Sequence, residues 1–193
     1  MVRISGGRLK GRRIVASKKV FAAAEGDELR PTSAKVREAI FNIMQAEIYN
    51  ALFLDLYAGT GAVGLEALSR GAEKVFFAED SRVRCKALMD YIHRLNLDDR
   101  TSVYQGKAEA FLQSAVRKGL KFDIIFADPP YLSDEIGKVL PYIGEQGLLK
   151  DGGSVLIEHS SKSTLHEGGM PHIRLIKQYR YGDTMITLYR KEK

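Results

Sequence analysis

Two carboxylates and a run of glycines suggest a chemistry for this sequence. Asp55 lies in an apolar stretch, and Gly59, Gly61 and Gly64 follow it at G-x-G-x-x-G spacing. This order is typical of a buried strand that leads through a glycine loop into a helix, where open α/β sheets bind nucleotides. A dinucleotide site has the same spacing, but a carboxylate at position 55 would repel a pyrophosphate. The pattern therefore favours a cationic ligand with an ammonium group.

The second carboxylate belongs to Asp128-Pro129-Pro130-Tyr131, which follows the mostly apolar residues 122–127. An exocyclic amine on a base is a poor nucleophile, because its lone pair is delocalised into the ring. The Asp128 carboxylate and the Pro129 carbonyl can accept its two N–H bonds and stabilise the positive charge that develops on nitrogen. The two prolines stiffen the loop, and Tyr131 offers a ring for stacking an unstacked base. Together the two motifs resemble those of class I S-adenosylmethionine-dependent methyltransferases that act on an exocyclic amino nitrogen.

Further cofactor contacts are expected at the ends of the next two strands. Glu79 follows the mostly apolar residues 74–78 and lies 18 residues after Gly61 of the glycine loop. This is close to the roughly 20-residue spacing at which an acidic residue binds ribose hydroxyls. Asp80 beside it is interpreted as a helix cap. The turn after residues 101–105 commonly frames an adenine ring. The predicted cofactor-binding set is Asp55, Tyr57, Ala58, Gly59, Thr60, Gly61, Glu79, Asp80, Lys107, Ala108 and Asp128.

Hydrophobic periodicity predicts the elements that position these residues. A helix is expected after Arg30-Pro31-Thr32-Ser33, since proline and hydroxyl residues are helix-start signals. Arg37 near its start is interpreted either as a contact to substrate or as an ordinary surface residue. Strands are expected at residues 53–56, 74–78, 101–105, 122–128 and 154–158, helices at 62–69, 82–96, 108–118 and 133–145, and a hairpin turn at 181–184.

The net charge of +6 is concentrated at the N-terminus. Residues 1–24 have no Asp or Glu, and residues 3–15 are typical of a hairpin around glycine turns. Such an arm can follow a phosphate backbone with an affinity that weakens with salt, or can be a basic edge that discourages strand aggregation. The expected RNA contacts are Arg3, Arg8, Lys10, Arg12, Arg13, Arg30 and Thr32.

The sequence offers little support for other chemistries. No apolar run reaches the roughly 20 residues that span a bilayer, and the first residues lack a signal-peptide pattern. Cys85 is the single cysteine, so an internal disulfide is excluded, no zinc cluster is expected, and a cytoplasmic location is predicted. Cys85 is expected to be a small, semi-buried side chain in a helix rather than a nucleophile. His159 is expected in a polar loop without a catalytic role.

The order of motifs along nearly the whole chain resembles the RsmD family of bacterial 16S ribosomal RNA guanine-N2 methyltransferases. The resemblance implies a Rossmann-like α/β fold with a seven-stranded, mostly parallel sheet and helices on both faces. It also implies S-adenosylmethionine as methyl donor and, as acceptor, one guanine of an rRNA that already has ribosomal proteins bound. Lys107 departs from the family pattern, which often has an acidic or polar residue there. The motifs are residues 3–12 (Arg-Ile-Ser-Gly-Gly-Arg-Leu-Lys-Gly-Arg), Arg30-Pro31-Thr32, residues 36–42, 55–61 and 64–71, Asp128-Pro129-Pro130-Tyr131, Ile157-Glu158-His159 and Tyr181-Gly182-Asp183-Thr184.

Three other functions stay open at this point. An adenine-N6 methyltransferase acting on RNA or DNA shares every motif except the N-terminal block. A non-catalytic RNA-binding protein would have no need of Asp128 and the glycines. A nicotinamide-dependent oxidoreductase is disfavoured by Asp55. We expect one domain over residues 1–193, with residues 1–30 as the basic arm and 31–193 as the catalytic core.

Overall fold

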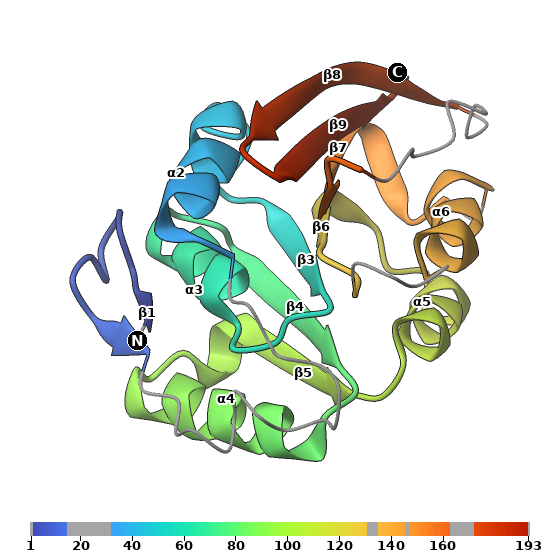
Figure 1. Cartoon of the computed structure of the whole chain (residues 1–193). Helices are drawn as coiled ribbons and strands as arrows, with labels where there is room; N and C mark the ends of the chain where they lie inside the picture. Colours follow the sequence, from blue (N-terminus) through green and yellow to red (C-terminus); the bar gives the residue numbers. More distant parts are fainter. Residues whose placement is uncertain (1, 15–31, 131–134, 146, 163–171, 193) are drawn as a thin grey trace.

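The structure is a computed structural model that describes residues 2–14, 32–130, 135–145, 147–162 and 172–192. Arg30 and Tyr131, both predicted site residues, lie outside the described residues. Within the described part, seven strands form one sheet with the order β5-β4-β3-β6-β7-β9-β8 (Figure 1). The strands are β3 (Leu52–Leu56), β4 (Lys74–Glu79), β5 (Thr101–Gln105), β6 (Phe122–Ala127), β7 (Leu149–Ser160), β8 (Ile173–Tyr181) and β9 (Thr184–Lys191).

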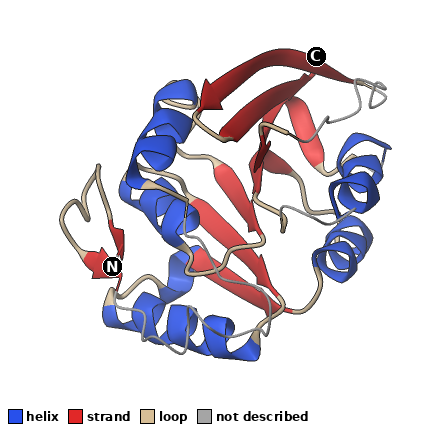
Figure 2. Cartoon of the chain, in the orientation of Figure 1, coloured by secondary structure: helices blue, strands red, loops and turns tan. Residues whose placement is uncertain are grey.

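The sheet is mostly parallel, as predicted. Strands β5, β4, β3, β6 and β7 pair in parallel, whereas β9 is antiparallel to both β7 and β8. Helices cover both faces (Figure 2). They are α2 (Ala34–Ile43), α3 (Ala62–Ser69), α4 (Arg82–Arg94), α5 (Ala108–Arg117) and α6 (Glu135–Glu145), with a 3-10 turn, η1, at Asp98–Arg100.

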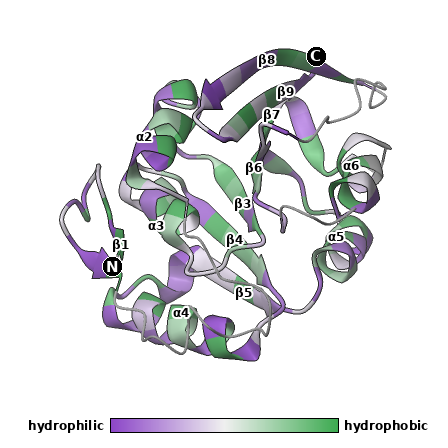
Figure 3. Ribbon diagram, in the orientation of Figure 1, coloured by the Kyte–Doolittle hydropathy of each residue, from purple (hydrophilic) through white to green (hydrophobic). Residues whose placement is uncertain are grey.

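The central strands separate two apolar cores, because successive side chains of a strand point to opposite faces. In β6, Ile124 packs in the core under α2, α3 and α4, and Ile125 packs in the core under α5 and α6. In β3, Phe53 and Leu54 divide in the same way. Figure 3 shows the apolar residues along β3. Burial on both faces explains why these strands are continuous apolar runs in the sequence.

Two serines cap the helices that follow the expected start signals. The Ser33 side chain accepts a hydrogen bond from the Val36 N–H at the start of α2, which confirms the predicted helix start. The Ser81 side chain accepts from the Arg84 N–H at the start of α4. The interpretation of Asp80 as the cap was therefore wrong. α4 begins at Arg82, so the residue before it, Ser81, is the one whose side chain reaches the N–H of the third helical residue, Arg84.

The N-terminal hairpin also forms. Strands β1 (Val2–Arg3) and β2 (Arg13–Ile14) pair antiparallel in a small separate sheet. Val2, Ile4 and Ile14 are buried and extend the core shared by α2, α3 and α4. The hairpin is therefore anchored by apolar packing, while its basic side chains Arg8, Lys10, Arg12 and Arg13 remain exposed.

The C-terminal strands differ from the prediction. β7 continues to Ser160, so His159 lies in a strand and is 5% exposed, not in a polar loop. Antiparallel pairing with β9, including His159 with Met185, extends the strand beyond its apolar stretch. The predicted turn at 181–184 is confirmed, with Gly182 at a φ of +66° between β8 and β9. In the described part of the chain, no helix has the length and apolar character needed to cross a membrane.

Candidate active site at the carboxyl edge of the sheet

Four parallel strands end together at one edge of the sheet. Leu56 at the end of β3 is level with Ala78 in β4 and with Ala127 in β6. Glu79 at the end of β4 is level with Gln105 at the end of β5. The loops that follow these strands contain the predicted cofactor and catalytic residues, so the fold gathers them at the edge where α/β sheets bind ligands.

The glycine loop after β3 has an unusual backbone. Tyr57, Gly59 and Gly61 all have positive φ angles, of 69°, 55° and 72°. This conformation is strained for a tyrosine. Two backbone hydrogen bonds hold the loop in place, from the Ala58 N–H to the Ala78 carbonyl at 2.9 Å and from the Gly61 N–H to the Ala58 carbonyl at 2.7 Å. The loop is therefore preorganised by its own backbone and by β4.

Gly64 and Tyr57 make specific contacts around the glycine loop. A Cβ added to Gly64 would lie 2.3 Å from Phe77 Cε1 and 2.8 Å from Val75 Cγ1, so only glycine lets α3 lie this close to β4. The Tyr57 hydroxyl donates to the Glu135 carboxylate at 3.3 Å. Burial and the neighbouring negative charge of Glu135 raise the pKa of Tyr57, so its hydroxyl keeps the proton that it donates.

Asp55 is buried beneath this loop, with 2% of its surface exposed. Its Oδ2 accepts a hydrogen bond from the Gly64 N–H at 2.8 Å and so holds the first turn of α3. Burial, reinforced by the negative charge of Glu79, raises the pKa of Asp55 to about 8, although the Gly64 N–H opposes the shift. Sequence reasoning missed this structural role, and the contact to a ligand ammonium remains a prediction.

Glu79 has a similar role at the end of β4. Its Oε2 accepts from the Gly59 N–H at 2.7 Å, and its Oε1 accepts from the Ser81 N–H at 2.9 Å. The Arg84 guanidinium lies 3.6 Å from Oε1. Burial raises the pKa of Glu79 despite these three lowering contacts. A carboxylate has about four lone-pair sites, so two N–H donors leave acceptor capacity for the predicted ribose hydroxyls.

The predicted adenine end of the site is formed by the loop after β5. The Gly106 N–H donates to the Glu79 carbonyl at 2.9 Å, which places this loop beside the end of β4. Ala108 is buried at the start of α5, whereas Lys107 and Asp80 are exposed. The Lys107 side chain makes no capping hydrogen bond to α5. Contact with an adenine ring at this loop stays a prediction.

The Asp128 loop lies directly beside the glycine loop. The Asp128 N–H donates to the carbonyl of Leu56, the last residue of β3, at 3.4 Å, so Asp128 lies beside the point where β3 leads into the glycine loop. Asp128 is half-buried, Pro129 is buried and Pro130 is exposed. The Thr32 hydroxyl, which the sequence assigned to RNA binding, lies 3.5 Å from Asp128 Oδ2. The start of α2 therefore lines the predicted catalytic carboxylate.

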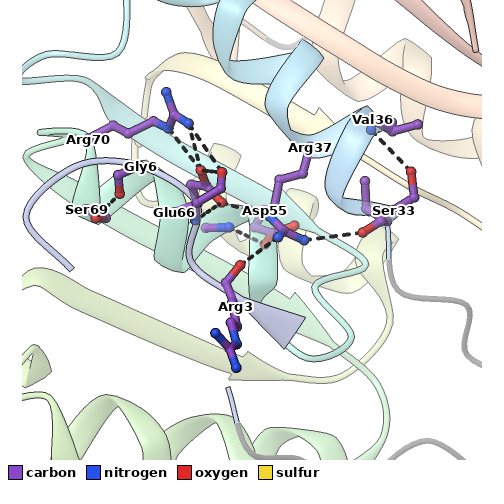
Figure 4. A network of polar contacts seen from close by, with 12 residues as sticks. Arg3, Gly6, Ser33, Val36, Arg37, Asp55, Glu66, Ser69 and Arg70 are labelled. Carbon is purple, nitrogen blue, oxygen red and sulfur yellow. Dashed lines mark hydrogen bonds and ion pairs between the residues drawn. The ribbon is translucent and has the colours of Figure 1, made fainter. Parts of the chain in front are cut away.

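Arg37 is buried at the centre of a polar network between three segments (Figure 4). Its guanidinium donates to Glu66 Oε2 at 2.7 Å, to the Arg3 carbonyl at 2.7 Å and to the Thr32 carbonyl at 3.3 Å. With 3% of its surface exposed, it is neither a substrate contact nor a surface residue, and both interpretations of Arg37 were wrong. A signal was available, since Glu66 is a charged residue in an otherwise apolar helix and predicts a buried partner.

Glu66 has further donors on the other side of its carboxylate. Arg70 Nη2 lies 2.8 Å from Oε1, the Ser5 N–H donates to Oε2 at 3.2 Å, and the Ser5 hydroxyl also donates to Oε1. Burial alone would raise the pKa of Glu66, but the hydrogen bonds from Ser5, Arg70 and Arg37 together hold it below 4.5. The N-terminal hairpin is thus fixed to α3. Through Arg37 it is also connected to Thr32, the residue whose hydroxyl lies beside Asp128.

The hairpin lies at the end of α3 that is remote from the glycine loop. The Arg8 N–H donates to the Ser69 carbonyl at 2.7 Å, and the Leu9 N–H donates to the Ser69 hydroxyl at 2.8 Å. An eight-residue helix is about 12 Å long, which separates these contacts from Gly61. The structure therefore brings Thr32 to Asp128 and places Arg8, Lys10, Arg12 and Arg13 farther out.

Comparison with known proteins identifies the family. Residues 2–190 match the model of the family "Conserved hypothetical protein 95". The chain belongs to this family. Escherichia coli "Ribosomal RNA small subunit methyltransferase D" is 30% identical, over 99% of this chain and 90% of its own, which agrees with the resemblance found in the sequence. Bacillus subtilis YlbH is 32% identical, over 98% of this chain and 99% of its own.

Solved structures in and around this family have the same fold. The Escherichia coli protein yhhF, 29% identical, superposes with a TM-score of 0.82 over 99% of this chain and 98% of its own. A protein crystallised with S-adenosylhomocysteine, 15% identical, has a TM-score of 0.68 over 85% of this chain and 51% of its own. The predicted α/β fold with its mostly parallel seven-stranded sheet is confirmed.

Two further titratable residues, Cys85 and His159, are buried. Cys85 is fully buried rather than semi-buried, its thiol donates to the Glu79 carbonyl at 3.3 Å, and burial raises its pKa to about 11. It is therefore a poor nucleophile. His159 Nε2 lies 2.8 Å from the Thr187 hydroxyl, and burial lowers its pKa. In the described residues, no three His, Cys, Asp or Glu side chains are grouped to hold a metal ion.

Proposed function

We propose that the protein transfers a methyl group from S-adenosylmethionine to the exocyclic N2 amine of a guanine in 16S ribosomal RNA. The observation that carries this proposal is the hydrogen bond from the Asp128 N–H to the carbonyl of Leu56, the last residue of β3 before the glycine loop. A carboxylate that can accept from an amine thus lies next to the loop expected to bind the methyl donor. Proximity and orientation of the two reactants account for much of the catalysis in a transfer of this kind.

The residues of the chain have distinct tasks in this reaction. S-adenosylmethionine supplies an electrophilic methyl group on a sulfonium. Asp128 and the Pro129 carbonyl accept hydrogen bonds from the two N–H groups of the amine, so its lone pair points toward the methyl carbon and the developing positive charge is stabilised. The nitrogen would form its new bond to carbon as the carbon–sulfur bond of the donor breaks, and the methylated nitrogen would then lose one N–H proton to water. Thr32 donates to Asp128 Oδ2, which restricts the rotation of the carboxylate and leaves it oriented for the base.

The cofactor assignment rests on the rigid loop and its acidic neighbours. Tyr57 to Gly61 form a preorganised turn, and Glu79 retains acceptor capacity for ribose hydroxyls. Asp55 accepts a hydrogen bond from Gly64 in the first turn of α3 and so lies beside the end of this turn. The protein of the same fold that was crystallised with S-adenosylhomocysteine supports this class of ligand. Lys107 and Ala108 are assigned to the adenine ring through their backbone.

Guanine is favoured over adenine by the chemistry of an acceptor. Guanine presents N1–H and N2–H₂ donors on one edge, and an ionised carboxylate only accepts. Adenine presents an acceptor, N1, beside its amine. The name of the Escherichia coli relative supports small-subunit rRNA as the substrate, and the exposed cations of the hairpin suit a phosphate backbone. An assembly particle that contains ribosomal proteins is the proposed form of the substrate.

The decisive test is transfer of labelled methyl to small ribosomal subunits that lack the modification, followed by nucleoside analysis. We expect label in N2-methylguanosine, abolished by Asp128→Asn, with cofactor affinity within about threefold of wild type. The matched control is Asp90→Asn, an exposed carboxylate on α4, which should retain full activity. Label in N6-methyladenosine would keep the mechanism and contradict the substrate, while an active Asp128→Asn variant would contradict the mechanism.

A further inference from the structure

The outer strand β8 is a second basic surface that the sequence did not reveal. Its residues are Ile-Arg-Leu-Ile-Lys-Gln-Tyr-Arg-Tyr, with three cations and no acidic residue. Arg174, Lys177 and Arg180 are all exposed. The strand pairs with β9 on one side and is the last strand of the described sheet, so its other edge faces outward. Figure 3 shows hydrophilic residues at the end of β8 that leads into the turn.

Strand register places one end of β8 level with the Asp128 loop. Ala127 pairs with Ile157, and β7 continues three residues further to Ser160. Ser160 pairs with Thr184, which in turn pairs with Tyr181 of β8. The sheet order from β6 to β8 spans three strand spacings, or about 14 Å. Arg180 and Tyr181 therefore lie within roughly 15 Å of the catalytic edge, and the Ser161 N–H holds the turn by donating to the Asp183 carbonyl at 2.8 Å.

The surface of β8 suits a nucleic acid better than another strand. Lys177 Nζ lies 5.1 Å from the centre of the ring of Tyr179, which packs partly against the core, so the ring holds this cation at the surface of the strand. Leu175 and Ile176 are 38% and 41% exposed, and the register with β9 shifts between Leu175 and Lys177. Such an irregularity, with three like charges, opposes edge-to-edge pairing of two copies. A polyanion would neutralise these charges.

We propose that the exposed side of β8, with Arg174, Lys177 and Arg180, is a second RNA-binding surface that contacts the phosphate backbone. This inference rests on the proposed function. The hairpin packs beside α3 and α4, whereas β8 lies at the other end of the sheet (Figure 1), so RNA would be bound on both sides of the target base. A nine-residue strand is about 30 Å long, close to one helical turn of a duplex.

The test compares two variants of equal charge change. In the first, Arg174, Lys177 and Arg180 are replaced by Gln. In the control, Gln replaces three exposed cations near the amino edge of the sheet, Arg117, Lys118 and Lys121. Binding to small subunits that lack the modification is measured between 50 and 300 mM KCl, with steady-state kinetics and S-adenosylhomocysteine affinity.

Each lost phosphate contact should lower the slope of log Kd against log salt by about 1, or roughly 3 in all. We expect KM for the subunits to rise about tenfold or more in the β8 variant, with kcat and cofactor affinity within about twofold. The control should keep the wild-type slope. A β8 variant whose slope and KM match the control would overturn the proposal, as would stronger self-association of that variant with unchanged RNA binding.

The single variant Arg180→Gln is the second measurement, should the triple variant fold poorly. It should lower the slope by about 1, and a wild-type slope would overturn the role of the end of β8 nearest the site. These outcomes are distinct from failure of the proposed function. If the wild-type protein puts no label into N2-methylguanosine, the function fails, and the binding comparison still tests the surface.

Discussion

Replacing Arg37 by Met tests whether the buried network holds the hairpin and α2 to the core. The change keeps an unbranched apolar stem in place of the arginine methylenes but removes the guanidinium. Three acceptors lose a donor, namely Glu66 Oε2, the Arg3 carbonyl and the Thr32 carbonyl, which lie at 2.7, 2.7 and 3.3 Å. Glu66 is fully buried, so water cannot readily replace the lost donor.

The expected loss of stability follows from these contacts. Removing one partner of a buried ion pair typically destabilises by about 3–5 kcal/mol. Glu66 retains Arg70 at 2.8 Å, and Arg70 is 23% exposed and has room to adjust. The free energy of unfolding should therefore fall by about 2–4 kcal/mol. For a domain of this size, this corresponds to a Tm lower by about 4–16 °C.

Urea unfolding of four proteins measures the coupling directly: wild type, Arg37→Met, Glu66→Gln and the double variant. The double-mutant cycle should give an interaction energy of about 1–3 kcal/mol. The matched control is Lys35→Met on an exposed position of the same helix, which should change stability by less than about 0.5 kcal/mol. A loss below about 1 kcal/mol for Arg37→Met would refute the reasoning.

The same network predicts a pH dependence with a definite sign. The pKa of Glu66 is lower in the folded protein than its ordinary value of 4.5. Its stabilising contribution is therefore complete above pH 4.5 and is lost as pH falls through the folded pKa. Wild type should lose more stability than Arg37→Met between pH 5 and pH 3. Equal acid sensitivity would show that Glu66 is not stabilised by Arg37.

Three further predictions concern the site and its surroundings. Because the pKa of Asp55 is raised to about 8, a ligand with an ammonium group should displace the proton of Asp55. Calorimetry at pH 7 in buffers of different ionisation enthalpy should show proton release with S-adenosylhomocysteine, which has an ammonium group, and none with 5′-methylthioadenosine, which lacks one. Equal proton release with both ligands would contradict an ammonium contact. Gly64→Ala should lower the free energy of unfolding, measured in urea, by about 1–3 kcal/mol, because the added Cβ overlaps Phe77. Gly137→Ala in α6, where an added Cβ meets no atom within 4 Å, should raise it by up to about 1 kcal/mol. Equal effects of the two substitutions would contradict this packing argument. Replacing Arg8, Arg12 and Arg13 of the hairpin by Gln should lower the slope of log Kd for RNA against log salt by about 3. An unchanged slope would show that the hairpin is a solvated basic edge.

Local sequence patterns predicted the elements that ordinary short-range chemistry determines. The glycine loop, the helix start at Ser33 and the turn around Gly182 depend on residues within a few positions of one another, and the structure confirms each. The number of strands and their mostly parallel direction followed from the family resemblance, and a buried parallel sheet is the expected outcome for continuous apolar strands. What was predictable was therefore the framework and the edge at which the site residues gather.

Contacts between distant segments were not predictable in the same way. Arg37 and Glu66 are 29 positions apart, and nothing near either residue in the sequence identifies the other. β7 extends to Ser160 because β9 supplies its hydrogen-bonding partners, which are 24 or more positions away in the sequence. The basic strand β8 was overlooked because its three cations are separated by uncharged residues, and because its exposure depends on its being the outer strand.

Asp55 and Glu79 show why residue type at a strand end does not settle a role. Both carboxylates were assigned to a ligand, and both accept hydrogen bonds from backbone beside the proposed ligand, Asp55 from Gly64 in the first turn of α3 and Glu79 from Gly59 in the glycine loop. An acceptor that stabilises the empty loop can also bind a ligand if it has further lone-pair sites. Substitution of either residue would therefore weaken ligand binding under both roles. Proton release from Asp55 depends on whether the ligand has an ammonium group, so it separates direct contact from support of the loop.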